Sequence, residues 1–427
     1  MPDQKIRPKT KKHRALAMLA LILAGEAIFL LPFVLVRVFR PTVLAVFDLT
    51  NFELGLIFSS YGVVAMLAYF FGGPLADRYP ARKLMSIALV ATALGGFYIA
   101  TLPSLNELKF LYGFWGATTI LIFWAAMIKA TREWGGKKLQ GSAFGLLEGG
   151  RGLSAAIIGS IAVAVFAALL PVDVASASLT QQKEAYKFVI ILVAIFIIGI
   201  AVFVWFVLPK NETTQSDEAS KFSTKGILKV VKMPVVWLQA IIIVCGYVAY
   251  KATDDFSLMA KDVLKYDDVQ SAGVGAMALY MRPIVAILAG LIADKLSASK
   301  MIIVSFLLML IGGLAIGSGF LNISIPWFFM TIIITTSIGI FALRGLYFAI
   351  MEEGNIPLIF TGTAVGLVSV IGYTPDIFMG PLMGYLLDRS PGILGHQHVF
   401  LVIASFSLIG MITAIIFRKF TRNIIVN

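Results

Sequence analysis

The chain has 427 residues, of which 59% are hydrophobic and 14% are charged. Soluble domains hold about 45–50% apolar and about 25% charged residues, so this composition excludes a water-soluble globule. A bilayer core about 30 Å thick takes about 20 apolar residues per helix, and the chain has enough of them for about twelve helices. One cysteine and three histidines leave little material for a disulfide framework or a metal site. We therefore expect no metal and no cofactor.

Twelve apolar runs are each long enough to cross a bilayer, and their positions can be read directly from the sequence. They fall at about 15–39, 53–71, 84–102, 108–130, 142–170, 187–208, 235–253, 270–292, 300–321, 324–350, 363–387 and 396–417. Basic residues concentrate in the N-terminal tail and in alternate connections, which places both termini in the cytoplasm by the positive-inside rule. The net charge of +12 therefore reflects topology rather than nucleic-acid binding. The short loops favour a bacterial inner membrane, with the lipid bilayer as the main partner.

A polar stretch at 209–234 divides the chain into two halves. We expect a cytoplasmic tail at 1–14, six-helix bundles at 15–208 and 235–417, and a second cytoplasmic tail at 418–427. Within the central loop, the segment from Gly226 to Lys232 predicts a short helix on the membrane surface. An internal repeat supports the division into halves. The segment Gly73-Pro-Leu-Ala-Asp77-Arg78 recurs as Gly290-Leu-Ile-Ala-Asp294-Lys295, and Gly141-Ser-Ala-Phe-Gly145 recurs as Gly362-Thr-Ala-Val-Gly366.

The segment between the second and third runs, Gly73-Pro-Leu-Ala-Asp-Arg-Tyr-Pro-Ala-Arg-Lys83, resembles the G-x-L-a-D-r-x-G-r-k signature of the major facilitator superfamily. It departs from the signature at Pro80, where the family usually has glycine. The resemblance covers the whole chain. It implies an all-α integral membrane protein with twelve transmembrane helices in two pseudo-symmetric six-helix bundles. It also implies a monomeric secondary transporter, not an enzyme, with a central cavity that opens alternately to either side.

The same segment carries a candidate conformational latch at the cytoplasmic end. Asp77 is a lone carboxylate among basic residues at a helix end, so it can pair locally or cap the positive N-terminus of a neighbouring helix. The resemblance implies that this neighbour is the eleventh helix, beginning near Thr361. We expect the latch to comprise Gly73, Asp77, Arg78, Arg82, Arg132 and Asp294.

Ionisable residues inside the apolar runs are functional candidates, because a charge near the bilayer centre costs at least about 2.5–3.5 kcal/mol. Cations outnumber carboxylates among them, which predicts a small anionic substrate. The expected substrate-binding residues are Arg37, Arg151, Tyr250, Lys251, Arg282, Arg344 and Tyr373. The expected proton-coupling residues are Glu26, Glu148 and Asp376, since a carboxylate in a low-dielectric cavity can load and release a proton.

Other interpretations of these charges stay open. Glu148 and Arg151 are three positions apart and can neutralise each other on one helix face. Asp376 can pair permanently with Arg282, and Arg344 can pair with Glu352 or Glu353. If the arginines are paired in this way, the same fold suits a proton-coupled exporter of neutral or cationic drug-like compounds.

A weaker resemblance concerns the cargo. Arg37 late in the first run, with the stretch from Tyr247 to Phe256 in the seventh, is similar to the organophosphate:phosphate antiporter and anion:cation symporter groups. Those groups hold an anion with an arginine in the first helix, and the antiporters use a second arginine in the seventh. Here Tyr250 or Lys251 occupies that second position.

Overall fold

The computed structural model describes residues 11–135, 140–209, 224–320, 323–356 and 361–426. In the first half of the chain, two of the membrane crossings contain a π-helical segment between α-helical segments. One crossing combines α1 (Lys11–Phe29), the π-helical segment η1 (Leu30–Val34) and α2 (Leu35–Val38), and α3 (Arg40–Phe47) follows it. The fourth crossing combines α6 (Leu105–Gly116), the π-helical segment η2 (Ala117–Trp124) and α7 (Ala125–Gly135). The remaining elements are α4 (Asn51–Arg78), α5 (Ala81–Ile99), α8 (Gln140–Ala168), the 3-10 turn η3 (Val174–Ser176) and α9 (Leu179–Val207).

The second half begins with a short helix, α10 (Thr224–Val231), which confirms the helix predicted in the central loop. Its other elements are α11 (Pro234–Lys251), the 3-10 turn η4 (Ala252–Asp254), α12 (Phe256–Leu264), α13 (Asp268–Leu296), α14 (Ala298–Gly317), α15 (Pro326–Leu346), α16 (Ile350–Glu353), α17 (Thr361–Gly372), α18 (Pro375–Arg389) and α19 (Ile393–Val426). No strand occurs among the described residues.

Twelve helices among the described residues are long and apolar enough to span a membrane, as the hydropathy pattern predicts. The sixth begins earlier than its apolar run, because Ser178 and Gln181 form a capping box that extends the helix into polar sequence. The eleventh crossing is interrupted between α17 and α18, directly before Pro375. Pro283, in contrast, lies within the continuous helix α13.

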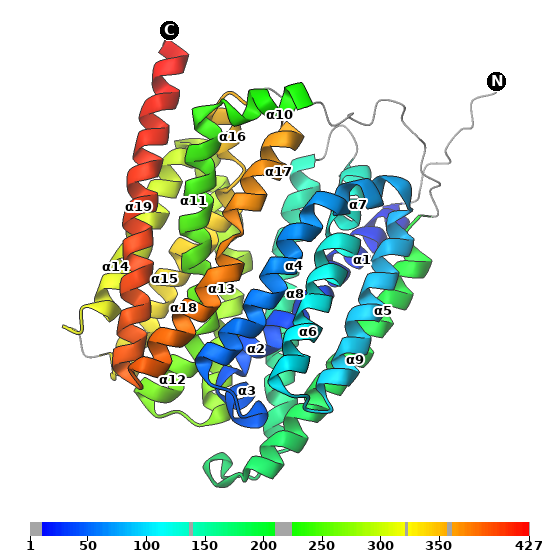
Figure 1. Ribbon diagram of the computed structural model, residues 1–427, viewed down its shortest axis with the longest axis vertical. Coiled ribbons are helices and arrows are strands. Elements are labelled where there is room, and N and C mark those ends of the chain that lie inside the picture. Colours follow the sequence, from blue (N-terminus) through cyan, green and yellow to red (C-terminus); the bar gives the residue numbers. More distant parts are fainter. Residues whose placement is uncertain (1–10, 136–139, 210–223, 321–322, 357–360, 427) are drawn as a thin grey trace.

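The helices form two pseudo-symmetric bundles that lie side by side (Figure 1). Two separate apolar cores hold them together. One is built almost entirely from residues of the first half, with Ala272, Ala276 and Leu279 of α13 packed onto it. The other is built from residues of the second half. Figure 1 shows the start of α1 and the end of α19 at one end of the bundle, here called the terminal end, and α3 and α12 at the opposite, distal end.

The two halves pack tightly at the distal end through glycines on α4 and α18. A Cβ on Gly55 would collide with the backbone of Gly380, and a Cβ on Gly384 would collide with the Asn51 carbonyl. At Gly62, a Cβ would lie 2.7 Å from the carbonyl oxygen of Asp376. Four glycines of the sequence repeat, which lie toward the terminal end, have open space instead: no atom comes within 4 Å of a Cβ added to Gly73, Gly145, Gly290 or Gly366. The described contacts between α4 and α18 are therefore closest at the distal end.

Candidate functional site

Charged side chains from both halves gather in the interior of the bundle. We call this set the charge network: Glu26, Arg37, Glu148, Arg151, Lys251, Asp254, Arg282, Arg344 and Asp376. It includes every candidate charge that the sequence suggests for substrate binding or proton coupling. It also includes Asp254, which the sequence analysis did not select.

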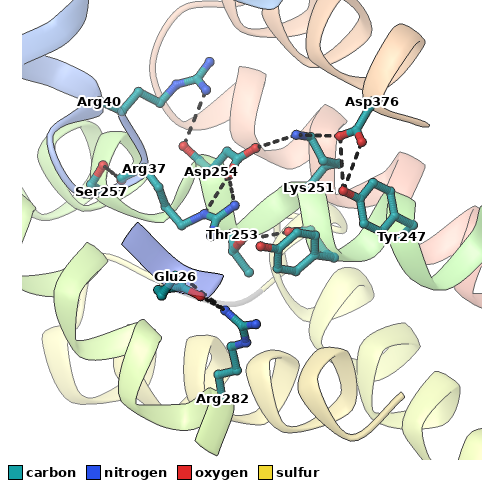
Figure 2. A network of polar contacts seen from close by, with 11 residues as sticks. Glu26, Arg37, Arg40, Tyr247, Lys251, Thr253, Asp254, Ser257, Arg282 and Asp376 are labelled. Carbon is teal, nitrogen blue, oxygen red and sulfur yellow. Dashed lines mark hydrogen bonds and ion pairs between the residues drawn. The ribbon is translucent and has the colours of Figure 1, made fainter. Parts of the chain in front are cut away.

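The part of the network nearer the distal end is a chain of ion pairs centred on Asp254 (Figure 2). Arg37 Nε donates to Asp254 Oδ1 at 2.7 Å, and Arg37 Nη2 forms an ion pair with the same oxygen, also at 2.7 Å. Lys251 Nζ lies 3.3 Å from Asp254 Oδ2 and also 3.3 Å from Asp376 Oδ1. The Tyr247 hydroxyl donates to Asp376 as well, at 3.1 Å from Oδ2. Two carboxylates thus hold two cations, and the Arg37–Asp254 pair joins the two halves.

Local structure explains how these groups meet. α11 ends at Lys251 and tightens into the 3-10 turn η4, which places Asp254 on the same side as Lys251, three positions away. Pro375 occupies the first turn of α18, which starts the helix again after the break and puts Asp376 beside the positive end of the helix dipole. Asp254 is 3% exposed and Lys251 is 1% exposed, so neither charge is screened by solvent.

The second part of the network is a four-membered cluster around Glu26. Arg282 of α13 reaches Glu26 at 3.3 Å and Glu148 at 3.2 Å. Arg151 lies 2.6 Å from Glu148 and 3.4 Å from Glu26, and it also donates to the Gly25 carbonyl at 3.0 Å. The side chain of Glu148 is 46% exposed while that of Glu26 is 3% exposed. Both arginines are therefore neutralised, and Glu148 is the solvent-accessible member.

Arg344 differs from the other four cations of the network because it forms no ion pair with a described residue. Its guanidinium carbon lies 3.9 Å from the centroid of the Tyr250 ring, and Arg37 lies 4.9 Å from the same centroid. The buried Nη1 of Arg344 has no hydrogen-bond partner. Of its two predicted partners, Glu353 instead accepts a hydrogen bond from the backbone N–H of Ser299, and the side chain of Glu352 lies outside the described residues. Arg344 is thus the excess positive charge when the five cations are matched with the four carboxylates.

Tyrosines surround the Arg344 guanidinium. Tyr373 stacks on Tyr69 with ring centroids 6.1 Å apart and meets Tyr247 edge to face at 5.0 Å. Tyr247 in turn lies 5.4 Å from Tyr250. These rings come from α4, α11 and the break between α17 and α18, so elements of both halves contribute. Aromatic faces beside a cation provide a surface on which a flat or ring-shaped ligand can stack.

The structure selects among the pairings that the sequence left open. Glu148 and Arg151 do pair along α8. Asp376 takes Lys251 as its partner, whereas Arg282 takes Glu26 and Glu148. Asp254 directly follows the seventh apolar run, so it is not among the charges within the runs. Its position three residues after Lys251 was the available signal.

A separate set of contacts closes the distal end between the halves. Asp388, at the end of α18, accepts hydrogen bonds from the backbone N–H groups of Asn51 at 3.0 Å and of Phe52 at 2.7 Å. These groups are unpaired donors of the first turn of α4, so Asp388 caps that helix from the opposite half. The Asn51 side chain also donates to Asp388, and Arg40 donates to the Asn51 side-chain oxygen at 2.9 Å. We call the contacts of Asp388 with α4 and of Arg37 with Asp254 the distal gate.

Arg40 adds a further buried charge at this gate. It is 1% exposed, and it contacts the backbone carbonyl of Asp254. Burial lowers the pKa of the Arg40 guanidinium from its usual value, while neighbouring aspartates, led by Asp255, oppose the shift. Ser257 reinforces the junction by donating to the Arg37 carbonyl at 2.9 Å.

The residues of the predicted latch lie at the terminal end, where only part of the set is described. Arg82 packs on Trp205 of α9 and donates to its carbonyl at 3.2 Å. Arg78 lies over the ring of its neighbour Tyr79. Arg132 is exposed near the end of α7, and Gly73 has open space around it. The side chains of Asp77 and Asp294 lie outside the described residues, so the latch stays a prediction.

Comparisons with known proteins agree with this architecture. The family model of the Major Facilitator Superfamily matches residues 15–374. The inner membrane protein YihN of Escherichia coli is 29% identical over 96% of each chain, and the inner membrane protein YqcE is 27% identical over 87% of each. Among solved structures, the chain aligns with a bacterial homologue of the human lysosomal transporter Spinster in an inward-facing, unoccupied conformation. The TM-score is 0.69 and the identity 14%, and the alignment covers 97% of this chain and 96% of that one. The nucleoside transporter NupG aligns with a TM-score of 0.69 and 12% identity, covering 96% of this chain and 98% of that one.

Proposed function

The chain belongs to the Major Facilitator Superfamily of transporters, and from this premise we propose that it carries a small organic anion across a bacterial inner membrane by secondary active transport. The observation that carries the anionic assignment is Arg344. Its guanidinium is partly buried, stacks on Tyr250 and has no carboxylate partner among the described residues. An unpaired cation in such a place is costly, and a bound anion would remove that cost.

Alternating access follows from the distribution of contacts between the halves. We take 15–208 and 235–417 as the two moving units and the terminal end as cytoplasmic, because the loops there are rich in lysine and arginine. The distal gate is formed and the repeat glycines toward the terminal end are unpacked, which is the pattern of an inward-facing state. Outward opening would then require Arg37 to leave Asp254 and Asp388 to leave the end of α4.

The charge network also supplies candidates for proton coupling. Asp376 pairs with Lys251 and accepts a hydrogen bond from Tyr247. Tyr247 is one of the tyrosines around Arg344 and packs against Tyr373. Protonation of Asp376 would release Lys251 from one of its two carboxylates, which links a proton to the charge of the substrate site. Glu26 is a weaker candidate, because it neutralises two arginines at once.

A thermal-shift screen tests the anionic assignment. Purified protein is tested against sugar phosphates, carboxylates, amino acids and inorganic anions, beside neutral and cationic dyes. A ligand at about 100 times its Kd stabilises the folded state by about 2.7 kcal/mol. We expect one class of anion to stabilise the wild type and to lose this effect in Arg344→Gln.

Arg389→Gln is the matched control, since Arg389 also lies over a tyrosine ring but is exposed at the end of α18. The anion should stabilise this variant as it stabilises the wild type. Equal stabilisation of Arg344→Gln by the anion would overturn the assignment. Stabilisation by neutral or cationic compounds alone would favour the drug-exporter alternative.

A further inference from the structure

A histidine and two aspartates form a second buried polar cluster, outside the charge network and near the distal end. His396, near the start of α19, and Asp255, which follows η4, are both 0% exposed. Nδ1 of His396 lies 2.7 Å from Asp255 Oδ2, and its Nε2 lies 3.1 Å from Asp262 Oδ2. The side chain of Asp262 is 33% exposed. The imidazole thus lies between a buried carboxylate and one that reaches solvent.

The hydrogen-bond count of this cluster requires an additional proton. A neutral imidazole has one N–H donor and one acceptor nitrogen, whereas a carboxylate oxygen is an acceptor only. Two carboxylates facing both ring nitrogens are satisfied only when the ring carries two protons or one of the aspartates is protonated. If the proton leaves, one of the two contacts becomes a meeting of two acceptors and must break. The geometry is therefore that of an occupied proton site.

The cluster is connected to the distal gate through the backbone. Asp255 directly follows Asp254, whose side chain holds Arg37 of the other half. Asp255 Oδ1 and Arg40 Nε are both buried without a hydrogen-bond partner, and the charge of Asp255 acts on Arg40 together with that of Asp254. Movement of Asp255 would therefore shift Asp254 relative to Arg37 and change the electrostatic environment of Arg40, both of which belong to the other half.

The remaining charged groups around the cluster are few. Asp262 also acts on Arg40, as does Asp388 of α18. Lys261, beside Asp262 on α12, is already paired with Asp268 at 2.7 Å. Lys265 Nζ donates to the backbone carbonyl of Asp262 at 2.8 Å, but among the described residues no cation other than the imidazolium pairs with the carboxylate of Asp255 or Asp262.

We propose that His396, Asp255 and Asp262 form a proton-binding site that is loaded from the distal side through Asp262 and that stabilises the closed distal gate. With the proton bound, the imidazolium ties η4 and α12 to α19 and keeps Asp254 in place for Arg37. Without it, two carboxylates face a neutral ring, one of the two hydrogen bonds of His396 is lost while the stacking of Phe256 on Phe400 remains, and the gate loosens. The inference deepens the proposed function, since it adds a proton to the transport cycle, but the protonation of His396 can be measured without any substrate.

The first test is a direct one, because the chain has only three histidines. The purified full-length protein is labelled with ¹⁵N-histidine, and its imidazole signals are assigned with His396→Gln and His398→Gln. We expect both ring nitrogens of His396 to be protonated at about pH 7.5, where an exposed histidine is mostly neutral. Asp262→Asn should convert His396 to a neutral tautomer. A neutral His396 in the wild type, with both aspartates ionised, would overturn the proposal.

The second test follows the gate itself. Spin labels are placed at the distal ends of α4 and α18 after replacement of the single, buried Cys245, and the distance distribution is measured against pH. Loss of a charge-assisted hydrogen bond should raise the open-to-closed ratio about tenfold as the pH rises through the titration of His396. The response should vanish in His396→Gln and persist in His398→Gln, whose changed side chain is exposed on the same helix.

The two tests separate this inference from the proposed function. A pH response that His396→Gln leaves intact would overturn the proton site, whatever the transported compound is. Failure of every anion to bind, with the His396 response present, would contradict the anionic assignment alone.

Discussion

Asp388 offers the sharpest test of the distal gate, because it is a cap supplied to one half by the other. In Asp388→Ala, the backbone N–H groups of Asn51 and Phe52 lose their acceptor, although both lie close enough to solvent to bind water. Thr50 and Glu53 continue to cap α4 from within its own half. The substitution therefore removes an interaction that exists only while the gate is closed.

The magnitude follows from the value of a helix cap. Removing an N-cap side chain costs about 0.5–2 kcal/mol, typically about 1 kcal/mol. Asp388 is exposed, so its charge is screened and the central value is appropriate. Since 1.36 kcal/mol corresponds to a factor of about ten, a loss of about 1 kcal/mol should raise the ratio of outward-open to inward-open protein about fivefold.

Double electron–electron resonance between spin labels at the distal ends of α4 and α18 measures this ratio. Glu53→Ala is the matched control, since it removes a carboxylate from the same helix end without touching the interface between the halves. We expect the long-distance population to grow in Asp388→Ala and to stay unchanged in Glu53→Ala. An unchanged distribution in Asp388→Ala, or the same shift in both variants, would refute the assignment of Asp388 to the gate.

Three further predictions address the packing and the buried carboxylates. Gly55→Ala should slow transport and favour the outward-open state, because the new methyl group would collide with the Gly380 backbone when the gate closes. Gly145→Ala is the control and should transport normally, because Gly145 has open space around it. Normal transport by both variants would contradict the packing argument. Glu26→Gln should destabilise the protein by about 3–5 kcal/mol, since it leaves the two buried arginines Arg151 and Arg282 with Glu148 as their remaining carboxylate partner. Asp376→Asn should fold, but its transport in a proteoliposome assay should no longer respond to the pH gradient. Equal thermal stability of Glu26→Gln and wild type would show that Glu26 is not a structural counter-ion.

Features that depend on neighbours along one helix could be predicted from the sequence. The twelve membrane helices follow from apolar runs of sufficient length, and the break before Pro375 follows from the chemistry of proline. The ion pair between Glu148 and Arg151 follows from their spacing of three on α8. Each of these depends on local geometry, which the order of residues determines.

Partners from different helices could not be predicted in this way. Asp254 and Arg37 are 217 positions apart, and their contact depends on how the two bundles meet at the distal end. The same holds for the cap that Asp388 provides to α4 and for the contact of His396 with Asp255.

The sequence by itself determined that this is a twelve-helix membrane protein with a duplicated architecture and an excess of cations among its buried charges. Only the tertiary structure decided which cation of the network has no carboxylate partner among the described residues. Five cations of the network compete for four carboxylates, and the choice among them depends on distances across the bundle that no spacing along one helix reveals. Because Asp254 takes Arg37 and Lys251 while Glu26 and Glu148 take Arg151 and Arg282, Arg344 remains for the substrate that we propose.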